Sequence, residues 1–438
     1  MIEYRNLRVA LLGAGSVGAQ VASLLLKHGE ELAQRAGAGL ELVGIAVRDP
    51  QAARTAHLPQ ELITTEAESL ILGADIVIEL MGGLEPARSY ILQALNSGAD
   101  VITGNKALLA THGQELFEAA EQVGAQLYYE AAVAGAIPII RPLRDSLAGD
   151  RIKRILGIVN GTTNFILDRM DSEGESLDAA LATATDLGYA EKSDPSADIE
   201  GHDAAQKTAI LASLAFHTTV PLEKVHREGI TTVTLQQVEE ARKAGYVVKL
   251  LSISERLTDA ITGHEGVSAR VYPALVPRDH PLAAVRGAKN AVFVEAEAAG
   301  DLMFYGAGAG GKETASAVLG DLVSAARRHV IGGPGVAEST HANLPILPIS
   351  SITTRYRITL SVIDKPGVLA AVAAMFSKHG VSVEAVEQSV RADGGSATAT
   401  LVIGTHKASE SDLSATVTAL EASDVVNSVT SVLRVEGI

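Results

Sequence analysis

A glycine-rich turn that directly follows an apolar strand constrains the fold of this chain more than any other feature. The segment Leu7–Leu12 is apolar and leads into Gly13, Gly15 and Gly18, and a helical pattern, Ala19–Lys27, follows. In a βαβ unit this spacing permits a tight turn and brings a pyrophosphate close to the N–H groups at the helix start. The motif predicts a dinucleotide-binding turn; the alternative is a purely structural turn. The expected contacts are Gly13, Gly15, Ser16, Val17 and Gly18.

The first 130 residues alternate short apolar strands with helical patterns. Strands are expected at Leu7–Leu12, Leu40–Val47, Asp75–Leu80, Asp100–Thr103 and Gln126–Tyr129. Helices are expected between several of them, notably at Ala19–Lys27, Pro86–Ser97 and Leu108–Val123. This alternation, with strands rich in Val and Ile, predicts an α/β fold with a parallel, doubly wound Rossmann sheet.

Charge and composition exclude several classes of function. Lys and Arg number 36 and Asp and Glu number 52, so the net charge is −16, and we expect neither a nucleic-acid partner nor a membrane surface. The chain has no cysteine, which excludes thiolate metal sites, disulfides and a cysteine nucleophile. The uncharged stretch Val9–Leu26 is interrupted by glycines and Gln20, so it predicts a strand, a turn and a helix rather than a membrane span or a signal peptide. We expect a cytoplasmic protein.

After residue 130 the pattern changes to that of an α+β domain. Long strands are expected at Ile152–Val159, Val267–Leu275 and Asn290–Glu297, and strong helices at His202–Phe216 and Leu235–Ala244. A glycine-rich segment, residues 306–311, then precedes a helical pattern that ends at His329. We expect this last helix to pack back onto the first domain.

A linker rich in glycine and proline separates this region from a third unit. Gly332, Gly333, Pro334 and Gly335 open the linker. The third unit has the order β-α-β-β-α-β, the split βαβ order of ferredoxin-like domains. Its elements are expected at Ile358–Ile363, Val368–His379, Val381–Val390, Ala397–Gly404, Ser411–Leu420 and Val425–Val435. The expected domains are 1–130 (nucleotide-binding, completed by about 308–330), 131–307 (catalytic and dimerisation), 331–354 (linker) and 355–438.

The residues after the second strand bear on the choice of cofactor. Arg48 and Asp49 follow the strand that ends at Val47. An acidic side chain at this place bonds a ribose 2′-hydroxyl, whereas an arginine accommodates a 2′-phosphate. Because Arg48 comes first, we expect NADP, with NAD tolerated. The alternative is a solvated Arg–Asp turn.

In an open α/β sheet, ligands bind beyond the carboxyl ends of the strands. In this chain those ends are Gly13, Arg48, Met81–Gly83, Gly104–Lys106 and Glu130. Lys106 is the one cation among the last three of these ends. We therefore expect Lys106 to lie where cofactor and substrate meet; the alternative is an ordinary solvated lysine.

The segment from Gly188 to Lys207 holds the densest group of polar side chains. Asp203 and Lys207 are four residues apart, so they share one face of a helix. The helix continues without charge over Thr208–Phe216, so we expect its interior to be buried and Lys207 to be partly desolvated. A carboxylate beside a desolvated lysine suits a proton donor and acceptor. The alternative is a structural i,i+4 ion pair.

Four motifs together resemble those of bacterial homoserine dehydrogenases. They are Gly104-Asn-Lys106-Ala, Glu130–Pro138, Asn160-Gly-Thr-Thr-Asn164 and the stretch Glu191–Lys207. The resemblance covers residues 1 to about 330 in order. The third unit, with Asp364-Lys-Pro-Gly-Val-Leu369 after its first strand, resembles the ACT amino-acid-sensing domain appended to many members of that family.

The resemblance implies roles for individual residues. Lys207 matches the family's proton donor, and Lys106 matches a second essential lysine near nicotinamide and substrate. Glu191 and Asp203 match positions that hold the amino and hydroxyl ends of homoserine.

Further matches concern the cofactor and a metal ion. Gly188 and Gly310 match nucleotide-contacting glycines, whereas Met81–Gly83 departs from the Thr or Ser found there in some members. A structural sodium site, built largely from backbone carbonyls, is implied at Glu130, Val133, Gly135 and Ile137. Such hard oxygen ligands suit an alkali ion, and no transition metal is required.

The implied reaction is the reversible NAD(P)H-dependent reduction of L-aspartate 4-semialdehyde to L-homoserine, in threonine, methionine and isoleucine biosynthesis. Lys207 would stabilise and protonate the developing alkoxide, and Asp203 would orient Lys207 or the substrate hydroxyl. Aspartate-semialdehyde dehydrogenase is excluded because it needs a cysteine. A non-catalytic nucleotide- and amino-acid-sensing protein is the remaining alternative, although a sensor has no use for a proton donor.

The third unit is expected to bind an amino-acid effector. Pro366 and Gly367 would set a turn that exposes N–H groups at the start of the next helix, where a carboxylate can bind. The expected contacts are Asp364, Gly367 and Val368, with threonine as a feedback inhibitor; the alternative is an ordinary turn. The resemblance also implies a homodimer or a homotetramer. We expect a chain that ends near Thr340 to remain active and to lose its response to threonine.

Overall fold

The computed structural model describes residues 6–259, 262–333, 336, 338, 340–391 and 398–437. Its contacts divide the chain into two compact units. The first comprises Met1–Gly161, Asp203–Val225 and Ala288–Leu344, and the second comprises Thr162–His202, His226–Gly287 and Pro345–Ile438. Two linker residues, Pro334 and Gly335, and the expected strand start Ala397 lie outside the described residues.

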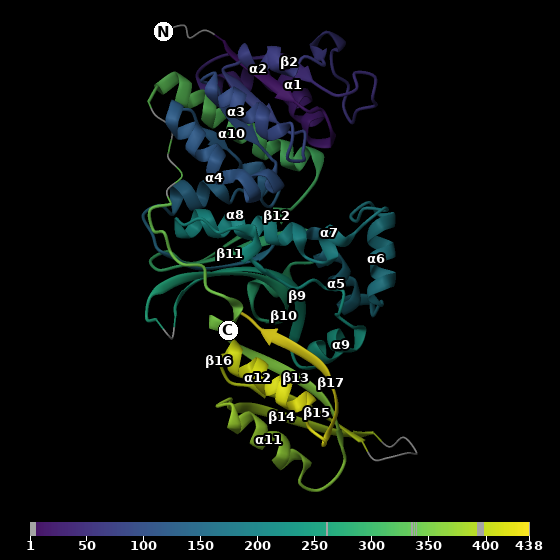
Figure 1. Cartoon of the computed structure of the whole chain (residues 1–438). Coiled ribbons are helices and arrows are strands. Elements are labelled where there is room, and N and C mark those ends of the chain that lie inside the picture. The colour runs from purple at the N-terminus through teal and green to yellow at the C-terminus, as the bar shows by residue number, and fades with distance from the viewer. Residues whose placement is uncertain are drawn as a thin grey trace. The chain divides into compact units, whose positions relative to one another are not determined.

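The first unit contains the predicted parallel sheet, in the order β3-β2-β1-β4-β5-β6. All neighbouring strands of this sheet pair in parallel, and the order reverses beside β1, as in doubly wound dinucleotide-binding sheets. The predicted Rossmann fold is confirmed. The strands are β1 (Leu7–Leu12), β2 (Leu40–Ala46), β3 (Ile63–Thr64), β4 (Ile76–Glu79), β5 (Asp100–Thr103) and β6 (Leu127–Tyr128). The helices are α1 (Ser16–Ala36), α2 (Ala67–Leu72), α3 (Ala87–Asn96), α4 (Lys106–Val123) and α10 (Gly311–Ile331), several of which are labelled in Figure 1.

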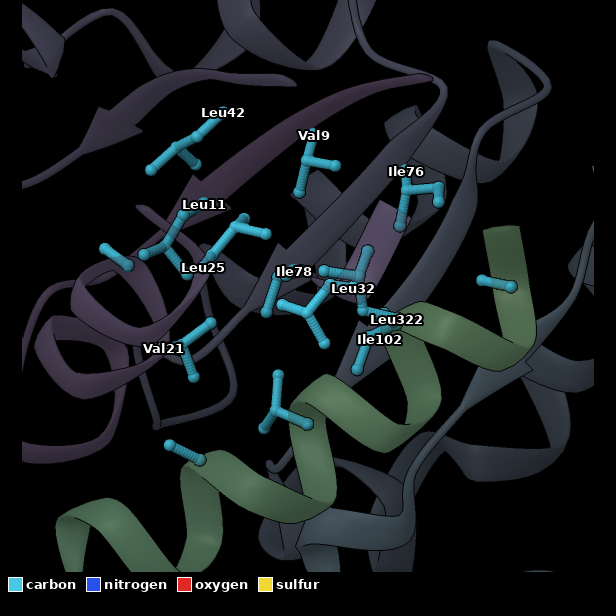
Figure 2. Close-up of a cluster of buried hydrophobic side chains, with 14 of the residues drawn as sticks. Val9, Leu11, Val21, Leu25, Leu32, Leu42, Ile76, Ile78, Ile102 and Leu322 are labelled. Carbon is cyan, nitrogen blue, oxygen red and sulfur yellow. The ribbon is translucent and has the colours of Figure 1, made fainter. Parts of the chain in front are cut away.

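A buried apolar core joins this sheet to helices α1 and α10. Figure 2 shows Leu11 of β1 and Ile78 of β4 among the side chains of this core, together with Leu25 of α1 and Leu322 of α10. Each of these four side chains is nearly or fully withdrawn from water, which is the main stabilising contribution to such an interface. Helix α10 thus shares a core with the parallel sheet and α1.

Three antiparallel strands and helix α8 complete the first unit. Strand β11 pairs with β7 on one side and β12 on the other. Helix α8 coincides with the predicted helix, and most of its residues are buried, whereas β12 was not predicted. These elements are β7 (Ile152–Ile158), β11 (Lys289–Ala296), β12 (Gly300–Ala307), α8 (His202–Phe216) and the short turns η2 (Glu130–Ala132), η3 (Pro142–Ser146) and η4 (Leu222–Lys224).

The second unit joins a long hairpin to the C-terminal β-α-β-β-α-β unit. Strands β9 and β10 pair antiparallel along their whole length, and β10 also pairs in parallel with β17. The order of strands is β9-β10-β17-β13-β15-β14. The predicted ferredoxin-like order is confirmed, but its last strand continues the sheet of the hairpin, which the linker-based prediction of a separate tail did not anticipate.

The elements of the C-terminal part are β13 (Thr353–Ile363), α11 (Val368–Lys378), β14 (Val383–Arg391), β15 (Thr398–Thr405), β16 (Ala408–Ser409), α12 (Glu410–Glu421) and β17 (Val426–Val435). The remaining elements are α5 (Gly161–Glu173), α6 (Leu177–Asp186), α7 (Ser196–Ile199), β8 (His226–Arg227), α9 (Leu235–Lys243), β9 (Tyr246–Thr258), β10 (Glu265–Pro277), η5 (Pro281–Ala284) and η6 (Ile349–Ser351). Across the described ranges of the chain, no helix combines the length and the hydrophobicity that a membrane span needs.

Candidate active site

The predicted nucleotide turn has a geometry that requires glycine. Gly13 has a φ of 96°, and a Cβ there would lie 2.7 Å from the Leu80 carbonyl oxygen. A Cβ on Gly18 would lie 2.0 Å from the Gly13 carbonyl oxygen. Within the described residues no side chain caps α1 at Gly15, so the first N–H groups of α1 are available to an anion. The turn therefore fits a dinucleotide phosphate.

Gly310 lies beside the same turn, although most of the chain separates the two in sequence. Gly310 is the N-terminal cap of α10 and has a φ of 128°. At the next position, Gly311, a Cβ would lie 2.6 Å from the Ser16 carbonyl oxygen. The fold therefore brings two helix starts, those of α1 and α10, to one place.

Arg48 and Asp49 differ in the contacts they already make. The Asp49 Oδ1 atom accepts the Gln51 N–H at 2.9 Å, and Arg54 donates to the Asp49 carbonyl oxygen at 2.8 Å. Arg48 is exposed, and no carboxylate among the described residues forms an ion pair with it. Of the two residues, Arg48 is the one whose charge is available to a ligand.

Three predicted catalytic side chains lie together in the first unit. The Lys207 Nζ donates to Asp203 Oδ2 at 2.7 Å and to the Val159 carbonyl oxygen at 2.7 Å. The Lys106 Nζ, on the first residue of α4, lies 3.3 Å from Asp203 Oδ1. Asp203 therefore bridges the two ammonium groups. Sequence spacing predicted the pair on α8, but the approach of Lys106 depends on the fold.

Burial makes the two lysines different. The Lys207 side chain is 11% exposed and the Lys106 side chain is 39% exposed. Burial of Asp203 opposes its ionisation, but the charges of Lys207 and Lys106 outweigh this, and the pKa of Asp203 falls to about 2. Asp203 is therefore an anion at neutral pH. It holds a buried cation in a fixed position, as a proton donor requires.

Asn160 is a further member of this group that the sequence analysis named only as part of a motif. Its Nδ2 donates to Asp203 Oδ2 at 2.9 Å. The same carboxylate oxygen thus accepts from both Asn160 and Lys207. The sequence analysis quoted Asn160 as the first residue of the Asn160–Asn164 motif. The spacing of that motif did not indicate that Asn160 would bond Asp203.

Gly188 and Glu191 lie in the second unit. Gly188 follows helix α6 with a φ of 78°. The Thr162 hydroxyl donates to the Tyr189 carbonyl oxygen at 2.8 Å, and the rings of Phe165 and Tyr189 are 5.0 Å apart. The beginning of α5 thereby supports the segment that leads to Glu191, which is exposed. The roles of Gly188 and Glu191 toward nucleotide and substrate stay predictions.

The expected sodium site lies around a buried carboxylate that is already occupied. The Glu130 carboxylate accepts the N–H groups of Ile139, Ile140 and Arg141 at 2.6, 2.8 and 2.9 Å, and the Arg141 Nε at 2.9 Å. The Glu130 side chain is therefore engaged by the protein itself, and the expected ligands at Glu130, Val133, Gly135 and Ile137 would be main-chain carbonyls. No cluster of three His, Asp or Glu side chains suited to a metal ion occurs in the part of the chain that is described.

Asp321 is a buried residue of this region that the sequence analysis missed. Its Oδ2 accepts the Glu130 N–H at 2.9 Å, and burial raises the pKa of Asp321 to about 7 although Arg141 opposes the rise. Asp321 lies on α10 and so reaches Glu130 only through the tertiary structure.

A cavity of about 480 Å³ in the C-terminal unit coincides with the expected effector site. Asp364, Gly367 and Val368 all line it, as does Gln388 of β14, which was not predicted. Gly367 caps α11 with a φ of 93°, and no side chain among the described residues caps this helix start. The cavity therefore offers N–H groups suited to a carboxylate.

A Rossmann sheet with a glycine turn suited to a dinucleotide, next to a buried lysine on α8 that is bound to a carboxylate, is typical of dinucleotide-dependent dehydrogenases. Comparison with known families narrows this class. Residues 13–130 match the model of the homoserine dehydrogenase NAD-binding domain, residues 138–323 that of homoserine dehydrogenase, and residues 356–424 that of the ACT domain.

Individual relatives match most or nearly all of the chain. The chain is 55% identical to the homoserine dehydrogenase of Mycobacterium tuberculosis, covering 99% of each chain. It is similar to the crystal structure of a homoserine dehydrogenase from Thiobacillus denitrificans, with a TM-score of 0.90, 38% identity and 99% of each chain covered. A hyperthermophilic archaeal homoserine dehydrogenase in complex with NADPH matches 75% of this chain and 99% of its own, with a TM-score of 0.60 and 27% identity.

The chain therefore belongs to the homoserine dehydrogenase family, and it is an oxidoreductase of amino-acid biosynthesis with an NAD(P)-binding domain and an ACT domain. The resemblance inferred from the four motifs is confirmed at the level of the family.

Proposed function

We propose that the chain catalyses the reversible reduction of L-aspartate 4-semialdehyde to L-homoserine with NADPH. The observation that carries this proposal is the buried Lys207, held by Asp203 at 2.7 Å and accompanied by Lys106. Membership of the homoserine dehydrogenase family supports it. The glycines of the nucleotide turn leave the close approach that a dinucleotide needs.

Each side chain of the site would have a separate role toward the substrate. The nucleotide turn would hold NADPH, which would supply a hydride for the aldehyde carbon. The Lys207 ammonium would stabilise the oxygen that becomes negative and would give it a proton. Asp203 would keep Lys207 charged and oriented, and Lys106, being more exposed, would contact the substrate at the cofactor side. Glu191 would hold the substrate amino group.

Replacing the proton donor tests this proposal. We expect Lys207→Ala to lower kcat by about 10²- to 10⁴-fold, the usual effect of losing a general acid, while the protein still folds and binds NADP. Lys243→Ala, on an exposed part of α9, is the matched control and should keep its kcat. Homoserine-dependent formation of NADPH, followed by absorbance, is the measurement. A folded Lys207→Ala variant with near-normal kcat would remove Lys207 from the mechanism.

NADP is the proposed preferred cofactor, with NAD accepted. The guanidinium of Arg48, which follows β2, supports this preference: it is exposed and has no ion-pair partner among the described residues, whereas Asp49 already accepts the Gln51 N–H. A 2′-phosphate would form charge-assisted hydrogen bonds with the guanidinium. The archaeal relative in complex with NADPH shows that a member of the family binds this form.

Threonine is the proposed effector, acting as a feedback inhibitor from the cavity at Asp364, Gly367 and Val368. The uncapped start of α11 would bind the carboxylate of the amino acid, and Asp364 and Gln388 offer polar groups for the rest. Inhibition requires that threonine favours one arrangement of the assembly over another. A homodimer or a homotetramer is the proposed assembly.

A sodium ion is proposed at the carbonyls of Glu130, Val133, Gly135 and Ile137. Ala134 and Gly135 both have left-handed backbone, with φ values of 60° and 58°, so the chain turns sharply there. Such a turn allows neighbouring carbonyls to converge, and neutral oxygens suit an alkali ion better than a transition metal.

A further inference from the structure

Glu79 is a buried carboxylate that the proposed reaction does not use. It is the last residue of β4, and it is completely withdrawn from water. In the sheet it lies opposite Leu12 of β1 on one side and Thr103 of β5 on the other. Because burying a carboxylate without partners is costly, its hydrogen bonds show what it holds in place.

Both carboxylate oxygens of Glu79 accept a hydrogen bond from a strand end. Oε1 accepts the Met81 N–H at 2.7 Å, and Oε2 accepts the Thr103 hydroxyl at 2.7 Å. The Thr103 oxygen in turn accepts the Asn105 N–H at 3.0 Å. Glu79 therefore fixes the turns that follow β4 and β5.

Asn105 completes this hydrogen-bond network and caps helix α4. Its Nδ2 donates to the Gly83 carbonyl oxygen at 2.6 Å, which ties the two turns together. Its Oδ1 accepts the Leu108 N–H at 3.2 Å and so caps α4. Lys106 is the first residue of that helix. The placement of the Lys106 backbone thus follows from the bonds that Glu79 makes.

The strand end that carries this hydrogen-bond network also contacts the nucleotide turn. Leu80, which follows Glu79, donates its N–H to the Leu12 carbonyl oxygen at 2.8 Å, and its own carbonyl lies against Gly13. On the other side, a Cβ on Gly104 would lie 3.2 Å from the Leu80 side chain. Leu80 thus contacts both Gly13 and Gly104, so a shift at Glu79 would move both the nucleotide turn and the start of α4, where Lys106 lies.

We propose that Glu79 is a positioning residue that sets the place of Lys106 relative to the nucleotide turn. It acts through Thr103 and Asn105 and touches neither substrate nor cofactor. The proposal rests on the role given to Lys106 in the proposed function. A displacement of a reacting group by 1 Å can lower the rate by about 10²-fold, so loss of this hydrogen-bond network should lower kcat.

Two conservative substitutions disrupt this hydrogen-bond network to different extents. Thr103→Val keeps the shape of the side chain but removes the hydroxyl, which leaves a Glu79 oxygen and the Asn105 N–H without their bond. Glu79→Gln can still accept the Met81 N–H, so it is the milder change. We expect kcat to fall by about 10- to 100-fold in Thr103→Val and by less in Glu79→Gln. If Thr103→Val does not fold, Glu79→Gln carries the same test.

The decisive measurement repeats both substitutions in a Lys106→Ala enzyme, with kcat determined at high enzyme concentration and the melting temperature recorded alongside. If Glu79 acts through Lys106, the second substitution lowers kcat no further, although it lowers the melting temperature by the same amount in both backgrounds. Asp100→Asn is the matched control. This carboxylate is equally buried at the amino end of β5, where it accepts the Gln126 N–H at 2.8 Å, so its loss should change stability and not kcat.

The possible outcomes separate the two proposals. An equal loss of kcat in both backgrounds, or a change in melting temperature alone, refutes the positioning role and leaves the proposed function intact. A wild-type kcat for Lys106→Ala by itself refutes the role of Lys106, and the positioning role fails with it.

Discussion

Replacing Asp203 by asparagine tests the electrostatic design of the site. The substitution keeps the size of the side chain and removes the charge that Lys207 and Lys106 share. The pKa of Asp203 lies at about 2, below its ordinary value of 3.8. At about 1.4 kcal/mol per pKa unit, this difference corresponds to about 2–3 kcal/mol of net stabilisation of the Asp203 carboxylate by Lys207, Lys106 and Asn160, after the cost of burial. Asp203→Asn should lose at least that much stability at pH 7.

Lys207 determines whether the loss is larger. Removing one partner of a buried ion pair generally costs about 3–5 kcal/mol, because the other charge stays buried. Lys207 has the Val159 carbonyl as a second partner, and Lys106 is exposed enough to turn toward water. We therefore expect a loss near the lower end of that range, about 3 kcal/mol.

The lowered pKa of Asp203 also predicts how its contribution to stability changes with pH. A carboxyl whose pKa is lowered by folding stabilises the folded chain above its ordinary pKa, and this contribution is lost as the pH falls from 3.8 toward 2. The difference in stability between wild type and Asp203→Asn should therefore be full at pH 7 and should shrink below about pH 4.

Thermal melting of both proteins between pH 3 and 8, together with kcat, is the assay. We expect kcat of Asp203→Asn to fall as well, because burial without a counter-ion disfavours the charged form of Lys207. Asp186→Asn, an exposed change on α6, serves as the control and should leave both quantities unchanged. A variant as stable as wild type at pH 7 would refute the reasoning, as would a stability difference that does not depend on pH.

Three further predictions follow from the proposed cofactor, effector and ion. Arg48→Ala should raise KM for NADP at least tenfold more than KM for NAD, because only NADP carries a 2′-phosphate; equal effects on steady-state KM would show that Arg48 does not discriminate. Asp364→Ala should weaken inhibition by threonine without changing kcat, whereas the exposed Asp424→Ala should not; a titration that shows unchanged inhibition would place the effector elsewhere. Replacing sodium by choline at constant ionic strength should lower the melting temperature, and an identical melting curve would argue against the sodium site.

Point substitutions test the effector more sharply than truncation near Thr340. Strand β17 pairs with β10, and the Tyr272 hydroxyl donates to Glu436 at 2.6 Å. Arg270 is buried beside this contact, 3.9 Å from Glu436. Cutting the chain would leave Arg270 and Tyr272 without these partners, so a loss of activity could arise from the damaged sheet rather than from the effector site.

Local patterns in the sequence determined the two ends of the molecule. The strand, glycine turn and helix around Gly13–Gly18 follow from short-range spacing, as does the β-α-β-β-α-β order of the C-terminal unit. The Asp203–Lys207 pair was also predictable, because residues four apart on a helix always share a face. These features depend on neighbours in the chain. The middle region was harder: β9 begins with Tyr246-Val-Val-Lys-Leu-Leu, which shows no clear period, and this strand was not predicted.

The tertiary structure alone decided which distant residues meet. Lys106 reaches Asp203 because the fold brings the start of α4 next to α8, and Gly310 lies beside the start of α1 because α10 packs against α1. Glu79 gave no signal in the sequence beyond a charge at the end of an apolar strand, and its partner Thr103 is set by the register of β4 with β5. Periodicity identifies which face of an element is buried, but it does not identify the partner on the next element, because that choice depends on the packing of the whole core.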